Sequence, residues 1–309
     1  MGPRFVTETG SGSGAVAGLL TGIQVGAALF ASQLIVSDVG VGLLGLLRYG
    51  IALLLLFPLL LLRPSAPIAR ADWLPIILLG LGQIGMMIAL LNTAVAYTSA
   101  ARVALIFATL PAVSMFIDLA LGRPFGGRRI GLGVALSIGG VAVLVGADAM
   151  TGGVRTNDVI GMGAAAGATL CVAVCSSLYA PFVRRYGPVK ISSVAFTVSL
   201  IPLGLIAVIL PSAQTPNEWT SAIWWLILAI GLSSGIGYLM WFHAIEKLPA
   251  TLVTGFLALS PITAAVLSLV SLATDMTPSL LIAVAIVCGG ILCFARFKER
   301  PIDRKEKHL

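Results

Sequence analysis

Charge is scarce in this chain of 309 residues. Only 10% of the residues are charged and 58% are hydrophobic, whereas an average soluble domain is about 25% charged. A soluble fold of this size would expose too much surface for so few charges. The net charge of +7 does not indicate a nucleic-acid partner, because the basic residues stand in short clusters between apolar runs. The composition therefore predicts a protein that lies in a lipid bilayer.

Residues with catalytic or metal-binding chemistry are also few. The chain has two histidines and almost no acids inside its apolar runs. A membrane enzyme needs paired carboxylates, a histidine cluster or a nucleophile with its base at membrane depth. The sequence therefore disfavours an enzyme and indicates no cofactor. Among the four cysteines, Cys171 and Cys175 share a helix face without a neighbouring His or carboxylate, so we expect neither a metal site nor a disulfide framework.

Long apolar runs are what the sequence has in abundance. A helix needs about 20 apolar residues to cross about 30 Å of hydrocarbon. Runs of this size predict an all-α integral membrane protein with ten transmembrane helices, at 15–37, 41–62, 73–97, 100–121, 129–147, 159–183, 191–210, 221–245, 250–273 and 278–295. Outside them, we expect a disordered cytoplasmic N-terminus over 1–14, an external linker over 148–158 and a cytoplasmic tail over 296–309.

The basic residues indicate the orientation of these spans. All 19 Lys and Arg residues except Arg48, Arg102 and Arg155 fall on one side, in the N-terminus, the even-numbered loops and the tail. Basic residues concentrate on the cytoplasmic side of membrane proteins. Both termini are therefore predicted to be cytoplasmic.

The chain repeats itself at an offset of 150 residues. Pro111 then meets Pro261, and Gly139-Gly140 meets Gly289-Gly290, without a gap. The two repeats, 15–147 and 159–295, hold five predicted spans each. Because five is odd, the second repeat enters the membrane inverted relative to the first. Inverted repeats with broken helices at matching places point to a secondary transporter.

The two prolines lie inside apolar runs, at matching positions of the repeats. Proline removes a backbone donor, so Pro111 should free the carbonyl of Phe107 and Pro261 that of Leu257. A freed carbonyl in a membrane needs a partner or a water-lined cavity. A simple packing kink is the alternative. We predict that both prolines act as hinges beside a central cavity.

Polar residues at membrane depth are costly and are candidates for substrate binding. Interhelical hydrogen bonding and local satisfaction of freed carbonyls remain alternative roles for them. In the eighth span, Ser234, Tyr238 and Trp241 share one helical face and could form an aromatic wall for a ligand. The alternative is that these aromatic residues belong to the interfacial aromatic belt. The candidates are Gln24, Gln83, Asn92, Thr109, Ser114, Ser234, Tyr238, Trp241, Ser260 and Thr263.

Three ionisable residues inside predicted spans are candidates for a specific role. Arg48 could snorkel toward Asp38 in a structural role, the interpretation we favour, or face the cavity and bind an anion such as a carboxylate. Asp118 and His243 are candidate proton carriers. However, Asp118 lies near the cytoplasmic end and His243 near an interface, so no clear midplane carrier is present.

The repeat pattern resembles the EamA-type transporters of the drug/metabolite transporter superfamily. The residues that carry the resemblance are "LLRYGIALLLL", "AVAYTSAARVALIFATLPAVSMFIDLALGRP" and "IGLGVALSIGGVAVLVG", repeated as "AIEKLPATLVTGFLALSPITAAVLSLVSLATDMTPS" and "IVCGGILCF". The family often has a Glu after the fourth and ninth spans, where this chain has Gly122-Arg123-Pro124 and Thr274-Asp275-Met276. The resemblance implies a ten-helix bundle that moves small metabolites by alternating access.

Within that family the chain is similar to bacterial inner-membrane amino-acid exporters of the YddG type, and this resemblance implies a location in the bacterial inner membrane. We therefore expect a transporter that exports small metabolites, and we favour amino acids, including aromatic and apolar ones. A transporter of nucleosides, sugars or drugs, a channel and a membrane enzyme are the alternatives. The expected partners are a small-molecule substrate and lipid, with no obligate protein partner evident.

Overall fold

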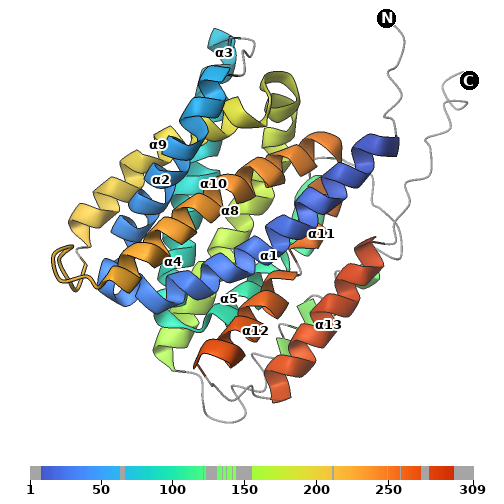
Figure 1. Ribbon diagram of the computed structural model, residues 1–309. Coiled ribbons are helices and arrows are strands. Elements are labelled where there is room, and N and C mark those ends of the chain that lie inside the picture. Colours follow the sequence, from blue (N-terminus) through green and yellow to red (C-terminus); the bar gives the residue numbers. More distant parts are fainter. Residues whose placement is uncertain are drawn as a thin grey trace, which may run out of the picture.

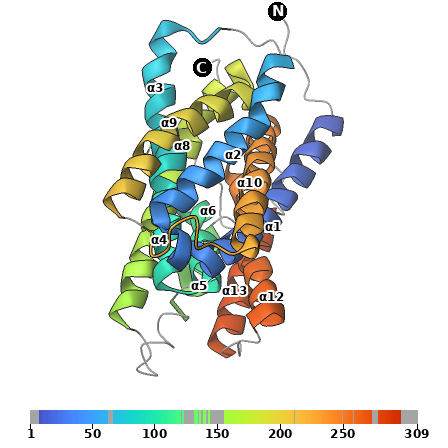
Figure 2. The ribbon, with the colours of Figure 1, turned by 60° about the vertical axis from the view of Figure 1, so that its left-hand side comes forward.

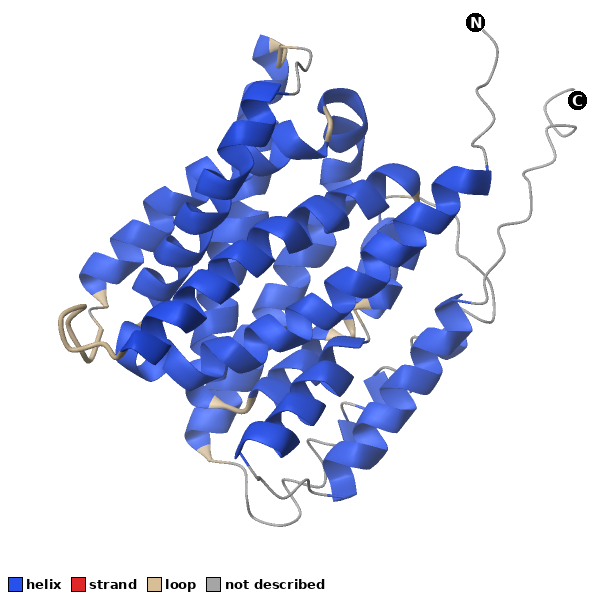
Figure 3. Cartoon of the chain, viewed as in Figure 1, coloured by secondary structure: helices blue, strands red, loops and turns tan. Residues whose placement is uncertain are grey.

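The computed structural model is a bundle of helices (Figures 1 and 3). It describes residues 8–62, 67–120, 122, several between 131 and 143, 155–210, 212–248, 250–257, 259–272 and 278–295. Within this part of the chain, every regular element is helical. The prediction of an all-α fold is therefore confirmed.

The helices fall into two groups along the chain. The first group is α1 (Glu8–Val39), α2 (Val41–Leu62), α3 (Arg70–Gly80), η1 (Leu81–Met86), α4 (Met87–Tyr97), α5 (Ala100–Phe107) and α6 (Leu110–Ala120). The second group is α8 (Thr156–Tyr186), α9 (Pro188–Ile209), α10 (Ser221–Lys247), α11 (Ala250–Phe256), α12 (Leu259–Leu272) and α13 (Pro278–Ala295). The helices α3 and α4 are joined by the π-helical segment η1 and make one long span.

Eight stretches are long and apolar enough to cross a membrane, and each overlaps one of the predicted spans. Two shorter apolar helices, Gly131–Gly140 and Leu281–Gly290, lie where the fifth and tenth spans were predicted. One boundary differs clearly from the prediction. The helix α1 begins at Glu8, so residues 8–14, expected to be disordered, belong to it.

The two halves interlock. The first helix of the first half, α1, packs along α10 and α12 of the second half, and α8 packs in the same way along α4 and α6. The second helices of the halves, α2 and α9, pack against each other. These contacts can be followed in Figures 1 and 2. The first helix of each half thus packs against the corresponding helices of the other half.

The two spans that contain Pro111 and Pro261 are both broken. In the first, α5 ends at Phe107 and α6 begins at Leu110; in the second, α11 ends at Phe256 and α12 begins at Leu259. Pro111 and Pro261 therefore lie in the first turn of the following helix, where the missing N–H is not needed. The chain turns just before each proline rather than at a proline inside a continuous helix.

Local hydroxyls bind carbonyls at the two breaks. Thr109 donates from its hydroxyl to the carbonyl oxygen of Ile106 at 2.7 Å. The carbonyl oxygen of Leu257, which we expected Pro261 to free, accepts from the Ser260 hydroxyl at 2.6 Å and from the Ser260 N–H at 2.9 Å. The hydroxyl of Thr263 donates to Leu259 at 2.9 Å. The side chains of Thr109, Ser260 and Thr263 thus donate hydrogen bonds to backbone carbonyls three or four residues earlier in the chain.

A glycine at every fourth position brings α1 close to the second break. The stripe consists of Gly14, Gly18, Gly22 and Gly26. A Cβ added at Gly22 would lie 2.1 Å from the carbonyl oxygen of Phe256, and one at Gly26 would lie 2.3 Å from that of Ser260. Small residues at this spacing let membrane helices approach backbone to backbone. The stripe therefore lets α1 lie directly on the end of α11 and the start of α12.

Polar contacts tie both ends of α8 to the first half. Near its start, Asp158 accepts from the Thr98 hydroxyl at 2.9 Å and from Arg102 Nη1 at 3.0 Å. Near its end, Arg185 Nη1 donates to Asp72 at 2.8 Å. These contacts hold both ends of α8 against the first half of the bundle.

Candidate functional site

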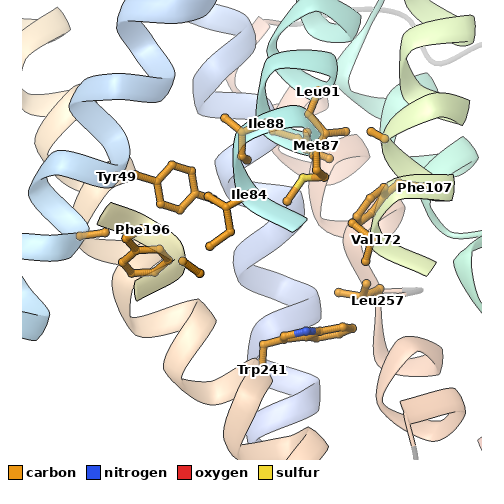
Figure 4. Close-up of a cluster of buried hydrophobic side chains, with 14 of the residues drawn as sticks. Tyr49, Ile84, Met87, Ile88, Leu91, Phe107, Val172, Phe196, Trp241 and Leu257 are labelled. Atoms are coloured by element: carbon orange, nitrogen blue, oxygen red, sulfur yellow. The ribbon is translucent and has the colours of Figure 1, made fainter. Parts of the chain in front are cut away.

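A cavity of about 50 Å³ lies between the two halves of the bundle. It is bordered by α1, α2, η1, α4, α8 and α10, and by the ends of α5 and α11 where the two spans break. Most of its lining residues are apolar, and Figure 4 shows several of these, including Met87, Phe107 and Leu257. The lining residues are Thr21, Gln24, Val25, Leu29, Arg48, Tyr49, Gln83, Met87, Ile88, Leu91, Phe107, Val172, Gly237, Tyr238, Trp241 and Leu257.

The cavity lies where the internal repeat meets itself. Half of the lining residues form pairs separated by 150 positions, the offset of the repeat. These pairs are Met87 with Gly237, Ile88 with Tyr238, Leu91 with Trp241, and Phe107 with Leu257. The same helix positions of both halves therefore face one space.

Two matching hydrogen bonds join the halves beside the cavity. Gln24 of α1 donates from Nε2 to the Ser233 hydroxyl of α10 at 3.4 Å. Ser176 of α8 donates from its hydroxyl to Gln83 Oε1 of η1, also at 3.4 Å. Ser233 is the repeat equivalent of Gln83, since 150 positions separate them. Both glutamines thus line the cavity and also act as the interhelical contacts considered for them.

Gln83 lies in the π-helical segment η1, which the sequence did not reveal. A π-helical turn leaves one backbone carbonyl free of the usual ladder and is frequent at functional sites. Here the hydroxyl of Tyr238 donates to the carbonyl oxygen of Gln83 at 3.4 Å. This contact fixes Tyr238 of α10 against the first half at the edge of the cavity.

Arg48 faces the cavity rather than the outer interface. Its side chain is buried, and its Nε donates to the Ser234 hydroxyl at 2.6 Å. Ser234 donates in turn to the Ile230 carbonyl at 2.6 Å. Asp38, toward which we expected Arg48 to snorkel, instead accepts from Gln214 at 3.2 Å. Of the two positions considered for Arg48, the structure therefore has the cavity-facing one, with Ser234 as its anchor.

Aromatic side chains form one side of the site. The ring of Tyr49 packs against Phe196 at a centroid distance of 5.1 Å and against Tyr238 at 5.9 Å. Trp241 is 4% exposed, so it belongs to the interior and not to an interfacial belt. Figure 4 shows Trp241 at one end of the cluster, with Leu91 and Ile88 at the other.

Several predicted site residues lie away from the cavity. Asn92 is buried and donates to the Val41 carbonyl at 3.0 Å, which ties α4 to the start of α2. Ser114 is buried in α6, and its hydroxyl finds no partner among the described residues. His243 lies near the end of α10, 3.7 Å from Glu246, with 38% of its side chain exposed. Asp118 is in α6, but its side chain lies outside what the structure describes.

The sequence analysis named five of the lining residues and missed the others. The five are Gln24, Arg48, Gln83, Tyr238 and Trp241. Thr21, Tyr49 and Val172 gave no signal in the sequence. The repeat offset, however, contains usable information, because it relates Tyr238 to Ile88 and Trp241 to Leu91. Candidates in one half therefore point to their equivalents in the other.

Comparisons with known proteins agree with this architecture. The model of the EamA-like transporter family matches twice, over residues 12–146 and 159–296. Curated proteins give no match. One solved structure, described as "Crystal structure of protein", has a TM-score of 0.66 and 20% sequence identity. The alignment covers 93% of this chain and 96% of that chain, which shows a shared fold. From the two family matches, the chain is a member of the EamA-like transporter family.

Proposed function

We propose that this chain is a secondary transporter of the bacterial inner membrane that exports small metabolites by alternating access. Amino acids with apolar or aromatic side chains are the substrates we put first. The central cavity is the proposed binding site. Both termini are proposed to be cytoplasmic, as the distribution of Lys and Arg favours.

One observation carries this proposal: residues at equivalent positions of the two repeats line the same cavity. Phe107 and Leu257 end the two broken helices there, and Leu91 and Trp241 face it from matching spans. In transporters built from inverted repeats, substrate sites form between the repeats at discontinuous helices. Rocking of one half against the other then opens the site to each side in turn.

The size of the cavity supports a conformational cycle. Ligand pockets for small molecules usually measure about 300–1,000 Å³, whereas this cavity measures about 50 Å³, which is room for a few water molecules. Both ends of α8 are also held against the first half by Asp158 and Asp72. We propose that the structure represents a contracted state and that substrate enters when one of these ends separates.

Uniport or exchange is the mode of transport that the lining favours. No carboxylate and no histidine is among the residues that line the described cavity. His243 lies outside it, and its ring is half-exposed. A proton-coupled carrier needs a titratable group that substrate and proton both reach. In proteoliposomes, we expect a substrate gradient to leave lumenal pH unchanged; substrate-driven acidification or alkalinisation would contradict uniport.

Counterflow tests the proposed function. Proteoliposomes are preloaded with a mixture of amino acids, and uptake of labelled threonine, methionine and phenylalanine is measured in turn. The proposal predicts saturable, preload-dependent uptake of at least one of them. Flux that rises linearly with concentration and needs no preload would indicate a channel. Exchange of nucleosides, sugars or drugs alone would keep a transporter but reject amino acids as its substrates.

A further inference from the structure

The cavity holds a buried positive charge with no acid to neutralise it. Arg48 is 7% exposed, and no described carboxylate lies within 4 Å of it. Two acids near helix ends pair with other arginines. Asp158, near the start of α8, pairs with Arg102, and Asp72, near the start of α3, pairs with Arg185. A charge inside a membrane protein is costly unless it is paired or hydrated. The site therefore favours an anion.

The guanidinium of Arg48 is oriented but not saturated. Its Nε is held by Ser234, and its Cζ lies 5.6 Å from the centroid of the Tyr49 ring. Two described neighbours share hydrogen bonds with this side chain, the Ser234 hydroxyl and the Tyr49 hydroxyl. An Arg side chain carries five N–H donors in a fixed fork, and its terminal edge is suited to a carboxylate. Because these two neighbours use fewer than five donors, N–H groups of the guanidinium remain for a ligand.

One further polar group of the lining is buried without a partner among the described residues. It is the indole N–H of Trp241, a residue that is 4% exposed. Leaving a buried donor without a hydrogen bond is costly, so this group in the cavity wall favours a ligand that accepts. The buried residue Tyr49 also lines the cavity, where Arg48 and Tyr238 are the hydrogen-bonding neighbours of its hydroxyl. Both side chains can donate, which again suits an anion.

The rest of the lining is apolar. Leu29, Met87, Leu91, Phe107 and Leu257 surround the polar groups. The described lining contains no acid that could pair with an ammonium group. A ligand that fits has a single carboxylate and an apolar body. If the ligand also carries an amino group, that group finds no charged partner in the described lining.

From these observations we infer that Arg48 binds the carboxylate of the substrate, and that this site recognises the carboxylate and not the amine. The inference rests on the proposed transport function and specifies the chemical class of the substrate. Small apolar monocarboxylates without an amine therefore bind at least as well as the matching amino acids. Arg48 acts as a specificity-determining residue, and Ser234 as the residue that positions it.

Binding of three matched probes tests this inference without requiring transport. The probes are 3-phenylpropionate, L-phenylalanine and L-phenylalaninamide, titrated calorimetrically into the purified full-length protein. We expect the first two to bind and the amide to bind about tenfold or more weakly, because hydrogen bonds to charged groups are lost. The Arg48→Gln variant should lose the preference for acid over amide, while Arg48→Lys retains part of it. The matched control is Arg70→Gln, which removes an exposed arginine at the start of α3, outside the cavity, and should leave the probe affinities unchanged.

The outcomes separate the inference from the proposed function. Equal affinity of the wild type for acid and amide overturns the inference even if Arg48→Gln does not fold. Unchanged acid affinity in a folded Arg48→Gln variant overturns it as well, as does the absence of binding by all three probes. In each of these cases, saturable counterflow of a neutral metabolite would leave the transporter proposal standing. Failure of every metabolite class in counterflow would instead reject the transporter proposal itself.

Discussion

A single methyl group at Gly22 should disturb the contact between α1 and the second helix break. An ideal Cβ at this position lies 2.1 Å from the carbonyl oxygen of Phe256 and 3.2 Å from the Cβ of Leu259. The first distance is about 1 Å inside van der Waals contact. The clashing atom belongs to the backbone at the end of α11, so no side-chain rotation relieves it. The helices α1 and α11 must therefore separate.

The size of the effect follows from two opposing contributions. Alanine is favoured over glycine inside a helix by about 0.5–1 kcal/mol, while overpacking of a tight interior costs about 1–3 kcal/mol, and more where the backbone must move. Because the backbone must move here, we expect Gly22→Ala to lose about 2 kcal/mol. In a chain of this size, that lowers Tm by about 5 °C.

This prediction is tested by measuring Tm in detergent and the rate of counterflow in proteoliposomes. Gly22 lies between the cavity residues Thr21 and Gln24, so exchange should also slow several-fold. The control is Gly50→Ala in α2, where an added Cβ meets nothing within 4 Å; this variant should match or slightly exceed the wild-type Tm. A Gly22→Ala protein with wild-type Tm and full exchange would refute the close packing of α1 on the break.

Four further variants separate hinge, structural and cavity roles. Pro111→Ala and Pro261→Ala should each slow counterflow without preventing membrane insertion, since each lets the preceding turn become regular helix; full exchange in both would remove the hinge role. Asn92→Ala should lower the free energy of unfolding by about 1 kcal/mol through loss of its buried hydrogen bond, while substrate affinity stays unchanged. A changed affinity would indicate that Asn92 contributes to the site. Gly237→Ala adds a Cβ 2.3 Å from Gln24 Oε1; because that side chain can turn, affinity should fall more than Tm, and the reverse order would contradict this.

The architecture was accessible from the sequence because the membrane imposes it. Length and hydropathy predict the spans, since every backbone polar group must be satisfied within the bilayer. The offset of 150 predicts that Pro111 and Pro261 lie at equivalent breaks, and both spans are broken there. The positions of the turns were not predictable in the same way. They depend on Thr109 and on the Ser260 hydroxyl, which bind carbonyls locally.

The site was less accessible, because its residues come together only through packing between the halves. Hydropathy alone does not tell whether Arg48 faces lipid headgroups or a cavity; the contact with Ser234 of α10 decides it. The same is true of Trp241, whose sequence position suits an interfacial belt but whose indole is buried. The π-helical segment around Gln83 packs against α8 and α9, and hydropathy along the chain does not show such packing.

The central claim is that substrate passes through the cavity between the two repeats. Leu91→Cys, in a background without the four native cysteines, places a thiol in the cavity wall. The matched control is Val208→Cys in α9, a position that is 80% exposed on the outside of the bundle. The measurement is counterflow before and after reaction with N-ethylmaleimide, with and without substrate present during the reaction. We predict that modification at position 91 stops exchange, that substrate slows the modification, and that modification at position 208 changes neither. Full exchange by protein modified at position 91 would contradict the claim.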